Sequence, residues 1–207
     1  MGRLIEGGAH VFPLFPLARS VVEHTTRTVW LLDPGVTSRV RAARAALVAL
    51  HSQEEQLKAV SRWSGRSSVT TREQRARLKA ERQEIQDEFG TLELDPLRLE
   101  GEQYASPTDV MKHFGAREGD ARVWQGTYDY LCATANHPGL SATEYFEVVD
   151  GRPRATMANE FLRRFLTPCF TAWVRALEVW AVYSGWSREP VDEFLDRLHS
   201  VIPESVP

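Results

Sequence analysis

The stretch CFTAWVRALEVWAVYSGW, residues 169–186, decides the fold class. It is nearly all apolar and long enough to suggest a membrane span, but Arg175 and Glu178 lie in its middle, where charged groups are costly in lipid. We therefore expect a buried core helix. Residues 155–186 predict one long helix, or two helices that meet at Pro168, and so apolar a helix belongs at the centre of a helical bundle.

Helix start and stop signals place further helices around this one. Proline lacks a backbone donor and glycine frees the backbone, so Pro34-Gly35 ends a first helix and Pro138-Gly139 ends a later one. A small β-hairpin is possible near 145–155, about Asp150-Gly151. We predict an all-α protein of five to seven helices that includes a long charged helical hairpin. The expected helices cover residues 17–33, 40–60, 72–89, 107–115, 121–137, 155–186 and 189–199.

Length and composition indicate one helical domain of 207 residues, in which 52–90 can form a protruding helical hairpin and 91–106 a linker. A formal charge of −3 argues against a surface that attracts nucleic acid throughout, although local basic stretches can still bind phosphates. Cys132 and Cys169 have no metal-ligand spacing and indicate free thiols in a reducing compartment. No signal-peptide pattern is present, so we expect a cytoplasmic protein that does not enter a membrane.

The helix expected over 72–89 has segregated charge. Residues 72–82 hold four Arg, one Lys and two Glu, whereas the remainder is acidic. The simplest interpretation is a solvated surface helix with a basic and an acidic end. Its narrow apolar seam of Leu78, Ile85 and Phe89 also permits a non-catalytic interaction module, in which the seam binds a partner helix or a second copy of the chain.

Four ionisable side chains mark the first helix. Arg19, Glu23 and Arg27 are spaced four apart, so they lie along one stripe and can form a ladder of ion pairs. His24 is off that stripe, because five residues turn a helix by about 500° and place it roughly 140° round from Arg19. A half-buried Arg/Glu/Arg ladder is either an architectural tie or the edge of a pocket.

Several classes of site have no signature in the sequence. There is no glycine-rich strand-to-helix turn, no GxSxG and no HExxH. His51 with Glu54 and Glu55 has the spacing of a two-ligand contact on one helix face, but no second segment matches it. We therefore expect no metal site and no cofactor.

Arg19 and His24, separated by four residues, resemble the Rx4-6H motif of the HEPN superfamily. Active members of that superfamily are dimeric, metal-independent ribonucleases of toxin and antiviral systems. The wider pattern, Arg19 and Glu23 followed later by Tyr130-Leu131-Cys132 and Asn136-His137-Pro138, is similar to uncharacterised helical proteins placed near the superfamily. Here the motif lies in the first helix instead of a late one.

The resemblance implies a specific mechanism of RNA cleavage. Cleavage of RNA by its own 2′-hydroxyl needs a group that moves a proton near neutral pH and a cation that stabilises the charge on phosphorus. His24 would move the proton and Arg19 would stabilise the charge, while Arg39 or Arg41 would guide the RNA backbone. The resemblance also implies a homodimer, because two-fold pairing would bring two Arg/His sets together. The alternative is that Arg19, Glu23 and Arg27 tie helices together and His24 is a surface residue.

A small-molecule pocket or enzyme is a further hypothesis. Arg19, Glu23, Tyr130 and His137 would orient a ligand if they converge in one concave space. Aromatic side chains with polar atoms can line such a cavity between helices, although core packing is their commoner use. These are Trp30, Trp124, Tyr128, Tyr130, Trp173, Trp180, Tyr183 and Trp186.

Overall fold

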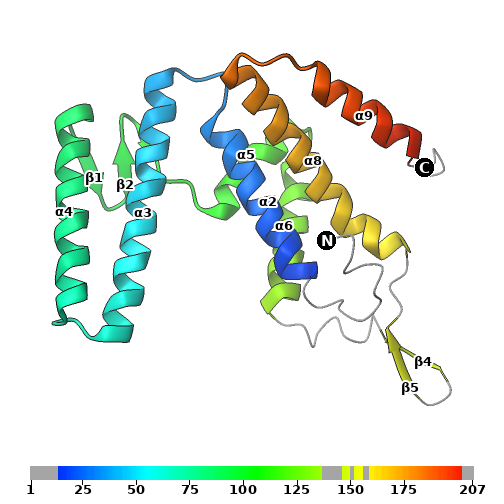
Figure 1. Ribbon diagram of the computed structural model, residues 1–207, viewed down its shortest axis with the longest axis horizontal. Helices are drawn as coiled ribbons and strands as arrows, with labels where there is room; N and C mark the ends of the chain where they lie inside the picture. The colour runs from blue at the N-terminus through cyan, green and yellow to red at the C-terminus, as the bar shows by residue number, and fades with distance from the viewer. Residues whose placement is uncertain (1–13, 137–145, 150–151, 156–158, 202–207) are drawn as a thin grey trace. The chain divides into compact units, whose positions relative to one another are not determined.

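The computed structural model describes residues 14–136, 146–149, 152–155 and 159–201 (Figure 1). These residues form seven helices and five short strands, which confirms the predicted all-α class with a small β-hairpin. None of the helices in these ranges combines the length and the apolar character needed to cross a membrane. The helices are α2 (Leu14–Leu31), α3 (Ser38–Ser64), α4 (Val69–Phe89), α5 (Pro107–Arg117), α6 (Ala121–Asn136), α8 (Asn159–Ser184) and α9 (Glu189–Val201). The strands are β1 (Leu92–Leu94), β2 (Leu97–Leu99), β3 (Glu102–Gln103), β4 (Phe146–Val149) and β5 (Arg152–Ala155).

The chain divides into two compact units, whereas the sequence analysis expected one helical domain. Unit 1 comprises residues 1–32 and 106–207, and unit 2 comprises residues 33–105. Unit 2 therefore interrupts unit 1 directly after the first helix. The division follows the contacts, because α2 packs on α5, α6 and α8, whereas α3 packs on α4 and on the strands that follow it.

The centre of unit 1 is the pairing of α2 with α8, which lie side by side (Figure 1). Small side chains of α8, namely Cys169, Ala172 and Ala176, are buried at spacings of three and four. The helix continues through Pro168, so it is one helix and not two. The expectation that α8 is buried on all sides is wrong, because its aromatic side chains lie mainly on an exposed face. The exposed aromatic side chains of α8 are Phe170, Trp173, Trp180 and Tyr183, and Trp186 just after the helix is exposed as well.

The connection into α5 and α6 follows its sequence signals. Ser106 caps α5 in a capping box with Asp109, and a proline occupies the first turn. Gly115 near the end of α5 lies so close to α6 that a β-carbon there would be 2.9 Å from Cβ of Trp124. Glycine thus permits the close approach of the two helices.

Unit 2 is built on the antiparallel pair α3 and α4 (Figure 1). Leu47 and Leu50 of α3 and Leu78 and Ile85 of α4 are buried in one cluster. The predicted hairpin over 52–90 is therefore present, but its first helix begins earlier, at Ser38. The apolar seam of α4 is covered by its own chain, so it is not available to a partner helix.

Residues 91–106 were expected to be a linker, but they contain the meander β1-β2-β3. Leu92 pairs with Leu99 across the first two strands, and both side chains are buried against the α3/α4 pair. Arg44 of α3 is buried and pairs with Glu102 of β3 at 2.8 Å. The alternating pattern of leucine and charged residues formed strands because α3 and α4 supplied an apolar surface for one face.

Candidate functional site

A polar cluster joins α2 to α6 inside unit 1. Arg19 and Glu23 lie one helical turn apart, and Arg19 Nε donates to Glu23 Oε1 at 2.8 Å. The hydroxyl of Tyr128 donates to the same carboxylate oxygen at 2.5 Å. Arg19 Nη1 donates to Oδ1 of Asn136, at the end of α6, at 3.4 Å. These four residues are called the Arg19 cluster below.

Burial in the cluster is graded from Tyr128 outwards. Tyr128 is buried, whereas the side chains of Arg19 and Glu23 keep 32% and 23% of their surface exposed. A guanidinium that is anchored on one side and partly open to solvent can still bind a further anion. Within the described residues, Nη2 of Arg19 has no hydrogen-bond partner. The cluster therefore presents an oriented and incompletely used cation.

Electrostatics keep the protonation states of the cluster well defined. Burial, followed by the hydrogen bond to Glu23 and one to Cys132, raises the pKa of Tyr128 above its usual range. The hydrogen bond to Glu23 also raises the pKa of Arg19. Tyr128 therefore remains a donor and Arg19 a cation, and both are held by the carboxylate.

His24 lies elsewhere on α2 and is exposed. Its Nδ1 is 2.8 Å from the carbonyl oxygen of Ser20. Because a carbonyl oxygen only accepts, Nδ1 carries the hydrogen, and in the neutral ring Nε2 holds the free lone pair. His24 bonds to the backbone of Ser20 and not to the Arg19 cluster, in keeping with its position roughly 140° away around the helix.

The remaining residues proposed for unit 1 have mixed outcomes. Asn136 joins the Arg19 cluster, as described above. Tyr130 does not, because it is two residues beyond Tyr128, about 200° around α6, and is exposed. Arg27 is half-buried on α2, but the bonds recorded for Glu23 run to Arg19 and Tyr128. His137 lies outside the described residues, so the convergence of Arg19, Glu23, Tyr130 and His137 stays a prediction.

Arg39 and Arg41 belong to unit 2 and are bound locally. Arg39 pairs with Glu100 at 2.5 Å and lies over the ring of Phe89, with its guanidinium carbon 5.3 Å from the centroid. Arg41 donates to the backbone carbonyls of Asp33 and Val36. The pair with Arg39 lowers the pKa of Glu100, with the hydrogen bond as the main cause. Both arginines thus have structural roles in the turn before α3 and at the meander.

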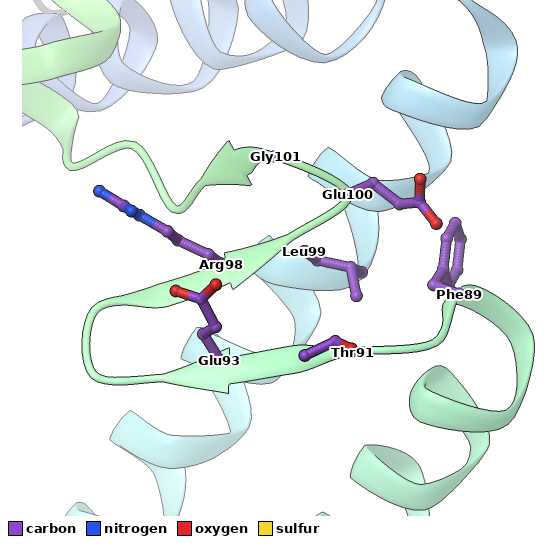
Figure 2. Close-up of a pocket in the computed structure, with 7 residues that line it drawn as sticks. All are labelled: Phe89, Thr91, Glu93, Arg98, Leu99, Glu100 and Gly101. Atoms are coloured by element: carbon purple, nitrogen blue, oxygen red, sulfur yellow. The ribbon is translucent and has the colours of Figure 1, made fainter.

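A pocket of about 350 Å³ lies on the meander of unit 2 (Figure 2). Glu93 and Arg98 face each other across β1 and β2, and Phe89 and Glu100 stand at the other end of the pocket. Arg98 also donates to Gln103. Arg98 and Glu100 thus already bind partners outside the pocket lining, Gln103 and Arg39, so these two charged groups are not left for a ligand.

The histidine considered for metal binding has another partner. The ring of His51 stacks on Tyr104 with centroids 3.9 Å apart. Across the described part of the chain, no group of three or more His, Cys, Asp or Glu side chains is placed to hold a metal ion.

Comparison with known proteins adds no relative. No protein-family model matches the chain, and no curated protein or solved structure shows significant similarity to it.

Sequence reasoning missed Tyr128 as a site residue. It was predicted only as one of the aromatic side chains that can line a cavity; by spacing it shares one face of α6 with Trp124, Leu131 and Ala135, and the structure buries it. A buried tyrosine hydroxyl needs an acceptor, however, and Glu23 is the acceptor it reaches. The available signal was thus that a buried tyrosine needs a hydrogen-bond partner. The helical spacing of the sequence shows that Tyr128 is buried, but it does not show which residue is that partner.

Proposed function

We propose that this chain is a HEPN-like, metal-independent ribonuclease in which Arg19 binds the scissile phosphate and His24 moves the proton. The observation that carries the proposal is the anchoring of Arg19. Glu23 and Asn136 orient its guanidinium, and among the residues that the structure describes one terminal nitrogen has no partner and can bind a further anion. An anion held there would gain most from the cation as negative charge develops on phosphorus.

His24 suits the second role because of its hydrogen bond to Ser20. That bond fixes the tautomer in which Nε2 is the basic nitrogen, on an exposed side chain. The 2′-hydroxyl of the substrate would attack phosphorus and pass its proton to Nε2, and the bond from phosphorus to the 5′-oxygen would break. The leaving oxygen takes a proton from water, which leaves a 2′,3′-cyclic phosphate and a 5′-hydroxyl.

The separation of Arg19 and His24 around α2 limits how both can reach one phosphate. Residues roughly 140° apart on one helix serve one site only if that site wraps the helix or is completed across an interface. We infer that Arg19 of one copy and His24 of a second copy act together in a two-fold dimer, which then holds two equivalent sites.

The test is cleavage of a 5′-labelled RNA of mixed sequence in EDTA by the wild type, Arg19→Ala, His24→Ala and the control Arg122→Ala. Arg122 is an exposed arginine of α6, so its removal changes charge without touching the Arg19 cluster. We expect cyclic-phosphate products from the wild type and the control, and loss of cleavage in the other two variants. An inactive wild type, or equal loss in all variants, would refute the proposal.

Mixing the two inactive variants tests the shared site. If Arg19 and His24 act across two copies, half of the dimers formed after subunit exchange contain one intact site of two, so about a quarter of the activity should return. If each copy carried a complete site, the mixture would remain inactive.

A further inference from the structure

The α3–α4 hairpin concentrates positive charge in an otherwise acidic chain. Residues 58–82 contain eight Lys or Arg and two Glu, which leaves 17 basic and 26 acidic residues in the rest of the chain. We call residues 58–82 the basic hairpin tip. Two of its cations are paired with carboxylates, Lys58 with Glu55 and Arg82 with Glu54. In the described chain the others have no carboxylate within ion-pair distance; they are Arg62, Arg66, Arg72, Arg75, Arg77 and Lys79.

This charge distribution opposes the stability of α4. Anions are favourable near the N-terminus of a helix and cations near its C-terminus. Four of the five basic residues of α4 lie at or before its midpoint, residue 79, whereas Glu84, Asp87 and Glu88 lie in its C-terminal half. The helix dipole alone would favour the reverse arrangement, so these cations do not serve to stabilise α4.

The cations form a continuous track. Arg72, Arg75, Lys79 and Arg82 are spaced by three, four and three residues, so they lie along one face of α4 over about 15 Å. The last three of them and Lys58 line a groove of about 540 Å³ between α3 and α4. Leu57 and Leu78 provide its apolar floor, and Glu54 contributes an acidic group that is already paired with Arg82.

An exposed tryptophan lies at the end of the hairpin where the track begins, close to the turn that joins α3 to α4. Trp63, in the last turn of α3, is 97% exposed, which is unusual for the largest apolar side chain. The turn that carries it is held by hydroxyl groups, since Thr71 Oγ1 donates to the carbonyl of Gly65 at 2.9 Å and Ser64 and Ser68 bond each other. Trp63 therefore projects from an ordered turn and not from a loose loop.

We propose that the basic hairpin tip binds a single-stranded nucleic acid, with phosphates on the cation track and a base stacked on Trp63. Basic grooves that track a backbone, with aromatic side chains beside them, are the features that bind single strands without sequence preference. An anionic bilayer would match the exposed end of the hairpin, but a flat surface does not enter the groove between α3 and α4 that Arg75 and Lys79 line. An acidic peptide would match the cations but has no flat ring to cover Trp63. The inference goes beyond the proposed ribonuclease, because it depends on unit 2 alone and would stand if the chain cleaved no RNA.

The experiment measures fluorescence anisotropy of labelled oligodeoxythymidylate and oligouridylate of 20 nucleotides in EDTA. The DNA strand has no 2′-hydroxyl, so its binding cannot be confused with cleavage. Five of the six cations left unpaired in the described chain, all except the off-track Arg77, are expected to contact a phosphate each; they are Arg62, Arg66, Arg72, Arg75 and Lys79. The slope of log K against log salt should then be about −3.5, and affinity should fall about 100-fold between 50 and 200 mM salt. Binding of both strands supports the proposal, and binding of neither at 50 mM salt overturns it.

Two matched pairs of variants locate the site. Arg75→Ala should make the slope of log K against log salt less steep by about 0.7. Arg77→Ala, which removes an arginine of the same helix that lies off the track, should leave the slope unchanged. Trp63→Ala should weaken binding by about 5- to 150-fold at unchanged slope, whereas Trp186→Ala, exposed in unit 1, should not.

Equal effects within either pair would overturn the assignment of the site. So would tighter binding to vesicles of anionic phospholipid, or to a 20-residue polyglutamate, than to the oligonucleotides. Circular dichroism of each variant establishes that the helices are retained.

Discussion

The buried ion pair of unit 2 allows a stability prediction whose size follows from the structure. Arg44 retains only 7% of its side-chain surface, and it pairs with Glu102 at 2.8 Å and with Asp33 at 3.9 Å. Replacing Arg44 by Met keeps much of the volume but leaves two carboxylates without their cation. Breaking a buried pair from one side costs about 3–5 kcal/mol. Because Glu102 keeps 26% of its side-chain surface and can be rehydrated, we expect a cost near the lower limit, about 3 kcal/mol.

Hydrogen exchange is the appropriate assay, because it reports on unit 2 separately from unit 1. A loss of about 3 kcal/mol corresponds to roughly 150-fold faster exchange of the amides in the centre of α3. The amides of α8 in unit 1 should keep their rates and serve as the internal control. The variant Arg39→Met removes an exposed arginine of the same helix that also pairs with a glutamate, and it should change exchange little.

A second variant separates charge from packing. Arg44→Met/Glu102→Leu removes the stranded carboxylate next to the lost cation, and should recover a large part of the lost protection. The reasoning is refuted if Arg44→Met accelerates exchange no more than Arg39→Met, or if the double variant exchanges as fast as the single one.

Three further predictions concern unit 1. Gly115→Ala should lower the free energy of unfolding by about 1–3 kcal/mol, because the added methyl group crowds α6. Gly126→Ala, which adds a methyl group in open space, should raise it by about 0.5–1 kcal/mol. Thermal unfolding of the two variants measures the difference. The pKa of Tyr128 is raised, so the folded state keeps a phenol proton that the unfolded state loses near its usual pKa of about 10. Its stabilising contribution is therefore complete below about pH 10 and is lost as pH rises through the raised pKa. At about pH 11 the absorbance at 295 nm should show one tyrosinate fewer in the folded wild type than in the unfolded protein. The variant Tyr128→Phe should abolish this difference. Burial raises the pKa of the Cys169 thiol to about 11. Iodoacetamide at about pH 8 should therefore label Cys169 far more slowly than Cys132 in the folded protein, and at the same rate after unfolding. Equal labelling rates in the folded protein would contradict the burial of Cys169.

The candidate site was predictable in part. The spacing of Arg19 and Glu23 was sufficient to predict their ion pair, because an interval of four residues brings side chains together on any helix. The choice between Tyr128 and Tyr130 was not, since it depends on how α6 is rotated against α2. In unit 2, too, only part of the site could be predicted from the sequence. The charge of residues 72–82 is evident from composition, but the groove exists only because α3 lies beside α4.

The sequence by itself determined the helices, their ends and the ionisable groups each one carries, because these follow from local periodicity, capping and the lack of a donor in proline. Only the tertiary structure decided which faces became buried. Residues 91–106 formed strands because α3 and α4 supplied an apolar surface, and the aromatic face of α8 stayed exposed although its composition favours burial. Hydrophobic burial is non-directional, so the partner that covers an apolar face is selected by the packing of the whole chain and not by the segment itself.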